Sequence, residues 1–199
     1  MTLTIGLTGS IATGKSTISR MFDDFNIPVI DADKISRDVV EPGMEAYKEI
    51  INQFGEEVLT DEKTINRATL GDLIFSDEAK RIQLNNIIHP AIRKEMLRQR
   101  DELINKQFKS VVLDIPLLFE SKLTHFVDKT IVVYADEKVQ LERLMKRNNY
   151  SEEEALKRIK SQMPVKEKAT LSDEVIDNNG SKHDSYIQLE SLLKKWHVL

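Results

Sequence analysis

Gly9-Ser10-Ile11-Ala12-Thr13-Gly14-Lys15-Ser16 is the stretch of sequence that decides the fold. It matches the pattern G-x-x-x-x-G-K-[ST], a glycine-rich loop between a strand and a helix. In such a loop, backbone N–H groups and the helix N-terminus point at phosphate oxygens, the lysine reaches the outer phosphates, and the hydroxyl can ligate magnesium. An apolar run precedes the loop and a helical pattern follows it. The sequence therefore predicts a loop that binds the phosphates of a nucleotide.

Four further short apolar runs predict strands of the same sheet, and the segments between the runs have helical patterns. Residues 111–113 and 131–133 are apolar at consecutive positions, so both faces of these strands should be buried. That burial is typical of an α/β protein with a mostly parallel, five-stranded sheet covered by helices on both sides. We expect strands over Leu3–Thr8, Pro28–Asp31, Ser110–Ile115, Thr130–Ala135 and Glu174–Ile176, and a first helix over Ser16–Phe25.

The composition excludes several classes of protein. Of the 199 residues, 40% are hydrophobic and 31% charged, which is typical of a chain that folds in water. The net charge of −4 gives no overall positive field for gripping nucleic acid, and the lack of cysteine excludes disulfides and thiol chemistry. No apolar run approaches the roughly 18 residues of a membrane span. We therefore expect a cytoplasmic protein without nucleic-acid or membrane partners, with its oligomeric state left open.

The spacing of the strands predicts two helical insertions. About 75 residues separate the second expected strand from the third, far more than the about 10–12 that a crossover needs. Within them, Leu84, Ile87 and Ile88 have helical spacing, and Pro90 is expected to interrupt the helix. Residues 138–168 hold nine Lys or Arg against five Asp or Glu, a local charge of +4. The predicted division is a core of residues 1–33, 108–137 and 169–199, a helical insertion of 34–107 and a lid of 138–168.

A phosphate-binding loop is compatible with a kinase, a GTPase switch or a mechanical ATPase. Asn105-Lys106 is followed by Gln107-Phe108, so the sequence lacks the Asn-Lys-x-Asp motif that specifies guanine. Mechanical ATPases usually need a larger core with remote coupling elements, for which 199 residues leave little room. A kinase fits the remaining residues better, and a nucleotide-dependent binding switch is the alternative from another class.

Three carboxylates lie at the C-terminal ends of expected strands, at the edge where open α/β sheets bind ligands. In Asp31-Ala32-Asp33, one group can orient a hydroxyl and accept its proton while the other holds the hydrated magnesium. The alternative is that an Asp here only caps the helix beginning near Lys34. Asp114 ends an apolar strand, as a carboxylate on the magnesium side does, and the alternative is that it only starts a turn.

Positively charged residues gather on two expected helices of the lid. Arg143 and Arg147 lie four residues apart and therefore share a face. Arg158 lies on the following helix, which Ser151 should cap with Glu154 at the capping-box position. Such a hairpin can close over a transferring phosphoryl group and stabilise its charge. The alternative is a solvated helix face with ion pairs.

The assembled residues closely resemble the dephospho-coenzyme A kinase family over essentially the whole chain. The run Asp114–Glu120 combined with His89-Pro90 is the most specific part, although His89 alone is more often a packing residue than a ligand. In one departure, Ala12-Thr13 stands where the family often has Gly-Ser, so a positive φ at Ala12 would be strained. The matching parts are Ile5–Gly9 with the loop, Val29–Asp33, His89-Pro90, Asp114–Glu120, Arg158–Gln162 and Asp177–Gly180.

The resemblance implies transfer of the γ-phosphoryl group of ATP to the ribose 3'-hydroxyl of dephospho-coenzyme A, with Mg²⁺. It implies an adenylate-kinase-like core, a substrate-binding insertion and a lid; another nucleotide or metabolite kinase is the alternative. It makes Asp33 the base, or only the group that orients the hydroxyl, and Lys15 with Arg143 or Arg147 the charge stabilisers. Further implied contacts are ATP with Ser10, Ile11, Ala12, Thr13, Gly14, Lys15, Ser16, Thr17, Asn178 and Gly180; substrate with Asp33, His89, Leu117, Phe119 and Arg158; and magnesium with Ser16, Asp31 and Asp114.

Overall fold

The computed structural model describes residues 2–75 and 77–199, which fold into two compact units. The first unit comprises Met1–Ile30 and Glu102–Leu199, and the second comprises Asp31–Asp101. Met1 and Ser76, which the predicted core and insertion include, lie outside the described residues. The units divide at residues 31 and 101, whereas the sequence placed the ends of the insertion at 34 and 107 and set a lid apart; that finer division stays a prediction.

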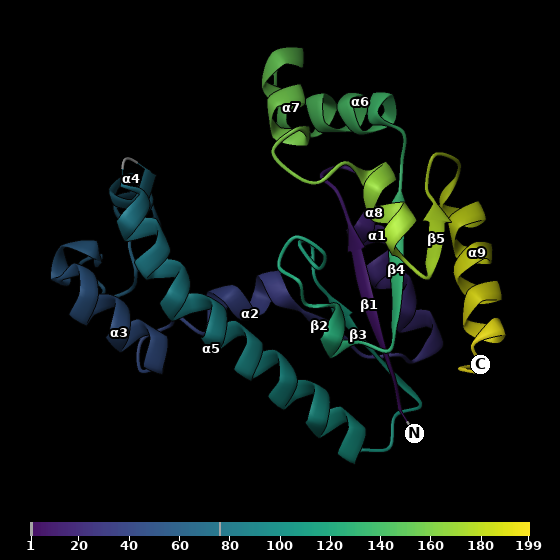
Figure 1. Ribbon diagram of the computed structural model, residues 1–199, viewed down its shortest axis with the longest axis horizontal. Helices are drawn as coiled ribbons and strands as arrows, with labels where there is room; N and C mark the ends of the chain where they lie inside the picture. Colours follow the sequence, from purple (N-terminus) through teal and green to yellow (C-terminus); the bar gives the residue numbers. More distant parts are fainter. Residues whose placement is uncertain (1, 76) are drawn as a thin grey trace. The chain divides into compact units, whose positions relative to one another are not determined.

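A five-stranded sheet has the strand order β2-β3-β1-β4-β5, as Figure 1 shows. The pairs β1–β3, β1–β4 and β4–β5 are parallel. The α/β class and the five predicted strands are confirmed, and no predicted end differs from the observed one by more than one residue. The strands are β1 (Leu3–Gly9), β2 (Val29–Asp31), β3 (Ser110–Asp114), β4 (Lys129–Tyr134) and β5 (Glu174–Asp177).

Both faces of the central strands are buried, as the consecutive apolar residues predict. Every residue of β3 is buried, and so are residues 130–133 of β4. Because successive side chains of a strand point to opposite faces, this burial requires cover on both sides of the sheet. Ile18 of the first helix and Leu189 of the last belong to the same buried cluster as Ile5 and Leu7 of β1. The sheet edge that carries the phosphate loop is thus held by a continuous core.

Helix α1 (Lys15–Met21) ends earlier than the predicted Ser16–Phe25. Phe22–Phe25 form a 3-10 turn, and Asn26 then adopts a left-handed conformation with φ 55°. The N–H of Asn26 donates to the carbonyls of Asp23 and Phe22, which closes the turn. Asn tolerates this conformation better than most residues, so the helix stops there and the chain extends into β2.

The remaining helices of the first unit follow β3 in the chain. They are α6 (Glu137–Asn148), α7 (Glu152–Ile159), α8 (Val165–Leu171) and α9 (Lys182–Lys195), with a 3-10 turn at Thr124–Phe126. The predicted cap of α7 is confirmed: the Ser151 hydroxyl accepts from the N–H of Glu154 at 3.3 Å, and the Glu154 carboxylate accepts from the N–H of Ser151 at 3.0 Å. This reciprocal box satisfies two backbone donors at the start of the helix.

The second unit is helical. It contains α2 (Ala32–Asp38), α3 (Glu45–Phe54), a 3-10 turn at Glu56–Val58, α4 (Arg67–Phe75) and most of α5 (Glu78–Asn105). The prediction that Pro90 interrupts the helix is wrong, because α5 runs through it. Pro90 removes one N–H and therefore the helical bond to the carbonyl of Asn86. Leu84 before the proline and Met96 after it are buried, and this packing holds the remaining turns of the helix together. Among the described residues, no helix is both long enough and apolar enough to span a membrane.

Candidate active site

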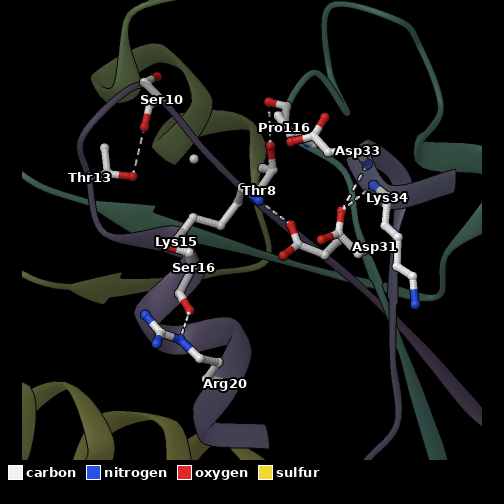
Figure 2. A network of polar contacts seen from close by, with 12 residues as sticks. Thr8, Ser10, Thr13, Lys15, Ser16, Arg20, Asp31, Asp33, Lys34 and Pro116 are labelled. Carbon is white, nitrogen blue, oxygen red and sulfur yellow. Dashed lines mark hydrogen bonds and ion pairs between the residues drawn. The ribbon is translucent and has the colours of Figure 1, made fainter. Parts of the chain in front are cut away.

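The phosphate loop, residues 9–16, connects β1 to α1 and folds around two left-handed residues (Figure 2). Gly14 has φ 91°, and a Cβ built there would lie 2.1 Å from Asn178 Nδ2, so only glycine fits. Ala12 has φ 61°, which confirms the strain predicted for this position. Within the loop, the Thr13 hydroxyl donates to the carbonyl of Ser10 at 2.9 Å.

The carbonyl of Thr13 is held from outside the loop. Asn178 Nδ2 donates to it at 2.7 Å and Arg143 Nη1 at 3.4 Å. Asn178 is buried and fixed in turn, because its Oδ1 accepts from Ser185 Oγ at 2.9 Å and its carbonyl accepts from Arg143 Nη2 at 2.7 Å. A trans peptide directs its C=O and N–H in opposite directions. Holding the Thr13 carbonyl therefore turns the N–H of Gly14 away from these anchors, as a phosphate-binding loop requires.

Lys15 forms an ion pair with Asp114, the last residue of β3. The side chain of Asp114 is 4% exposed and that of Lys15 17% exposed, so the pair lies largely out of solvent. Figure 2 shows the Lys15 side chain extending away from the first turn of α1. A phosphate would compete with Asp114 for the ammonium through charge-assisted hydrogen bonds. The structure thus brings together two of the residues predicted for the site.

The residues predicted to hold magnesium have the right chemistry for it. Ser16 is exposed at the start of α1, and among the described residues its hydroxyl has no hydrogen-bond partner. Asp114 adds a carboxylate oxygen close to the phosphate loop. Within residues 2–75 and 77–199, no three carboxylates or histidines group as a metal site. Mg²⁺ at a phosphate loop takes only one or two protein oxygens, the rest being water and phosphate, so Ser16 and Asp114 fit the ion.

The three lid arginines have different surroundings. Arg143 is half-buried and contacts the loop through its bonds to Thr13 and Asn178. Arg147 is exposed, and its Nε donates to Asn148 Oδ1 at 2.8 Å. Arg158 is also exposed and lies over the ring of Tyr150, 4.4 Å from the ring centroid, in a cation–π contact. The structure therefore places Arg143 at the loop and leaves Arg147 and Arg158 on the surface of the first unit.

Helices α6 and α7 also contact the tip of the loop. Ile11 and Ala12 pack against the small buried core of the α6–α7 hairpin, which contains Leu144, Ala155 and Ile159. The N–H of Ile11 donates to Gln162 Oε1 at 2.9 Å, and Ser10 Oγ donates to the carbonyl of Met163 at 3.1 Å. The segment between α7 and α8, which contains Gln162 and Met163, thus lies along the first half of the phosphate loop.

In the second unit, Asp31 is the N-cap of α2. Its Oδ1 accepts from the N–H groups of Asp33 and Lys34 at 2.8 and 3.1 Å, the contacts drawn in Figure 2. The capping role weighed for Asp31 is therefore present, and a magnesium role for it stays a prediction. Asp33 is exposed, and its carboxylate accepts no hydrogen bond from any described residue. Its carboxylate thus remains available to a hydroxyl.

The other predicted contact residues are distributed over both units. His89 is exposed on α5, and desolvation, followed by the charge of Arg93, lowers the pKa of its ring, which favours the neutral form. Leu117 and Phe119 lie in the segment after β3, and Leu117 is 42% exposed. Thr17 belongs to the first turn of α1, where its N–H donates to the carbonyl of Gly14 at 2.9 Å.

Gly180 is exposed in the loop between β5 and α9, next to Asn178. That loop is tied to the turn after β4, because Asn179 Oδ1 accepts from the N–H of Asp136 at 2.8 Å. Tyr134 donates to Asp136 Oδ1 at 2.8 Å, and this hydrogen bond is the main cause that raises the pKa of the Tyr134 hydroxyl. The predicted nucleotide loop is therefore anchored at two points, through Asn178 and through Asn179.

Sequence reasoning missed Lys168, which it counted only as part of the positive lid. The side chain of Lys168 is fully buried and contacts the carbonyls of Gly9 and Pro116 and the carboxylate of Glu120. One weak signal was present: Lys168 lies three residues after Val165, on the buried face of a short helix. An interior lysine at such a position needs partners that only the folded chain can supply.

Comparison with known proteins points to one family. A family model described as dephospho-CoA kinase matches residues 3–184. The chain is 59% identical to a dephospho-CoA kinase of Oceanobacillus iheyensis over 198 residues and 55% identical to one of Bacillus anthracis over 199 residues, with 100% of each chain covered in both comparisons. Among solved structures, it resembles a dephospho-CoA kinase from Campylobacter jejuni with a TM-score of 0.75, 30% identity and coverage of 99% and 100% of the two chains.

The strain at Ala12 predicts that Ala12→Gly stabilises the protein. A left-handed non-glycine residue costs about 1 kcal/mol, and glycine removes that cost, although the greater freedom of glycine in the unfolded chain offsets part of the gain. We expect a Tm increase of a few degrees in thermal unfolding. Ala169→Gly, inside helix α8 of the same unit, is the matched control and should lower Tm. An Ala12→Gly variant that is also destabilised would contradict the strain.

Proposed function

Because the chain belongs to the dephospho-CoA kinase family, it is a kinase, and we propose that it transfers the γ-phosphoryl group of ATP to the ribose 3'-hydroxyl of dephospho-CoA. The products are CoA and ADP. The observation that carries the proposal is the phosphate loop, whose Thr13 carbonyl is held outward while Lys15 extends to a carboxylate at the end of the neighbouring strand. ATP and dephospho-CoA are the proposed small-molecule partners.

In this proposal the loop binds ATP through its backbone. The N–H groups around Gly14 and the start of α1 donate to the phosphate oxygens, and the Lys15 ammonium neutralises the charge of the outer phosphates. Arg143, already hydrogen-bonded at the loop, is the lid arginine best supported as a further charge stabiliser. Arg147 and Arg158 would have to turn from their surface contacts to reach a phosphate. The loop of Asn178 to Gly180 is proposed to lie beside the adenine.

Ser16 and Asp114 are the residues proposed to hold magnesium, with Asp31 acting through the oxygen that its cap leaves unused. When bound, the ion would neutralise charge that develops on the phosphate oxygens. Its binding would also require Asp114 to share its carboxylate between the ion and Lys15. The protein residues thus supply positive charge and hard oxygen ligands on one short loop and one strand end.

Asp33 is proposed to receive the acceptor hydroxyl. Its exposed carboxylate can accept a hydrogen bond from that hydroxyl, orient it for in-line attack and take its proton. A loose transition state needs little proton removal early, so orienting the hydroxyl without acting as the base is the alternative role of Asp33. The proposed substrate contacts are His89, Leu117, Phe119 and Arg158. The insertion of residues 34–107 is proposed to bind the substrate, and residues 138–168 are proposed to close as a lid. The cytoplasmic location and the absence of nucleic-acid and membrane partners also stay predictions.

The direct test is ADP release in a coupled assay with a panel of acceptors. We expect ATP-dependent turnover with dephospho-CoA and only background turnover with adenylate, shikimate or gluconate. Lys15→Ala is the matched loss-of-function control, because removing a preorganised charge donor should cost about 10²–10³ in kcat. Preference for another alcohol or a nucleoside monophosphate would overturn the substrate assignment. Slow turnover that no acceptor stimulates would favour a binding switch instead.

Replacing Asp33 with Asn tests the second-unit carboxylate. Asp33→Asn should lower kcat about 10²-fold, because the amide cannot accept a proton, while ATP binding in calorimetry stays unchanged. Asp38→Asn, at the other end of α2 and also exposed, is the matched control and should behave as the unchanged protein. Near-normal kcat in Asp33→Asn would remove the base assignment.

A further inference from the structure

Lys168 of α8 is a charged side chain with no solvent exposure. An ammonium group removed from water costs several kcal/mol unless it is paired and its donors are satisfied. The Nζ atom has three donors and finds three acceptors: Glu120 Oε1 at 2.8 Å, the Pro116 carbonyl at 3.0 Å and the Gly9 carbonyl at 3.3 Å. The number of donors and acceptors therefore matches, so the buried ammonium keeps no donor without a partner.

The three acceptors come from segments that build the phosphate site. Gly9 ends β1 and begins the phosphate loop. Pro116 lies two residues after Asp114, the partner of Lys15, and its carbonyl also accepts from Thr8 Oγ1 at 2.9 Å, as Figure 2 shows. One ammonium thus joins the start of the phosphate loop to the segment that carries the Lys15 counter-ion.

The contact with Gly9 has a direct effect on backbone orientation. Because the C=O of Gly9 and the N–H of Ser10 belong to one trans peptide, Lys168 turns that N–H to the opposite side. The Thr13 carbonyl is held in the same way by Asn178 and Arg143 at the other end of the loop. Three cationic or amide donors therefore hold the two ends of the loop by their carbonyls, Lys168 at one end and Asn178 with Arg143 at the other.

The segment leading into α8 strengthens this connection. Gln162 Oε1 accepts from the N–H of Ile11, and the Met163 carbonyl accepts from Ser10 Oγ. The N–H of Met163 donates to Glu120 Oε1 at 3.4 Å, so Glu120 links the same segment to Lys168. The segment from Gln162 to Lys168 thus contacts the phosphate loop at several points, and Lys168 is its buried last residue.

We propose that Lys168 is a positioning residue for ATP, which sets the start of the phosphate loop through the carbonyls of Gly9 and Pro116. It does not touch the reacting atoms, and its effect is transmitted by the backbone. This inference rests on the proposed function, because it assumes that the loop binds ATP phosphates. Without the ammonium, the Gly9 peptide loses its anchor, and the loop must order itself on binding.

Glu120 must be neutralised together with Lys168 in any test of this role. Its Oε2 is buried and, among the described residues, has no hydrogen-bond partner, while its Oε1 pairs with Lys168 and accepts from the N–H of Met163. Removing Lys168 alone would leave this largely buried carboxylate without its cationic partner and destabilise the protein for reasons unrelated to the loop. The pair should therefore be neutralised together as Lys168→Met with Glu120→Gln, which keeps similar volumes.

The experiment measures ATP binding by calorimetry without acceptor and then steady-state kinetics. In the neutralised pair we expect a Tm near that of the unchanged protein, an ATP Kd and KM raised at least about 10-fold, and an unchanged KM for dephospho-CoA. A purely structural role would reduce the active fraction and leave the KM for ATP unaltered. Lys166→Met, an exposed lysine on the same helix, is the matched control and should change neither constant.

A second double variant, Lys168→Gln with Glu120→Gln, is measured in parallel, because the amide at position 168 can still donate to one carbonyl. Its ATP affinity should fall between that of the unchanged protein and that of the Lys168→Met, Glu120→Gln variant. Unchanged ATP affinity in either folded variant would overturn the inference. If neither variant folds while Lys166→Met does, Lys168 is a structural residue and the positioning role is rejected. Failure of the unchanged protein to bind ATP would instead reject the proposed function.

Discussion

The site depends on the hydrogen bonds that hold the Thr13 carbonyl away from the phosphate-binding side of the loop. Asn178, which directly follows β5, and Arg143 of α6 donate to this carbonyl, and both are far from Thr13 in sequence. The same peptide then directs its N–H toward the other side, and Gly14 is the one residue that fits beside Asn178. An anion-binding surface of backbone donors thus exists before a nucleotide arrives, so little ordering cost remains for binding.

Positively charged side chains lie in and around this loop. The chain has a net charge of −4, yet cations occupy the loop and the segments around it. Lys15 is paired with Asp114 and Lys168 with Glu120, and both ammonium groups are largely or fully buried. A fixed local cation such as Lys15 can bind a polyanion without an overall positive field, because the low dielectric around it strengthens the interaction.

Sequence patterns predicted the class, the five strands and the loop, because these depend on local periodicity and on a contiguous motif. They also predicted the strained Ala12 and the cap of α7. Pro90 was misjudged because buried anchors on both sides, not local propensity, keep α5 continuous. The partners of Thr13 and the contact of Lys168 with Gly9 could not be predicted, since they join residues more than 100 positions apart. Likewise, helical spacing alone could not separate the loop-bound Arg143 from the exposed Arg147.

Backbone amide NMR during titration with a non-hydrolysable ATP analogue tests the central claim most directly. The account predicts the largest shifts at the amides of Gly14, Lys15 and Ser16, which would meet the phosphates. We also expect the side-chain amide of Asn178 to be protected from hydrogen exchange before the analogue is added, because its bond to the Thr13 carbonyl is already formed. Loop amides that do not respond, or an Asn178 side-chain amide that becomes protected only after the analogue binds, would contradict a loop organised before binding.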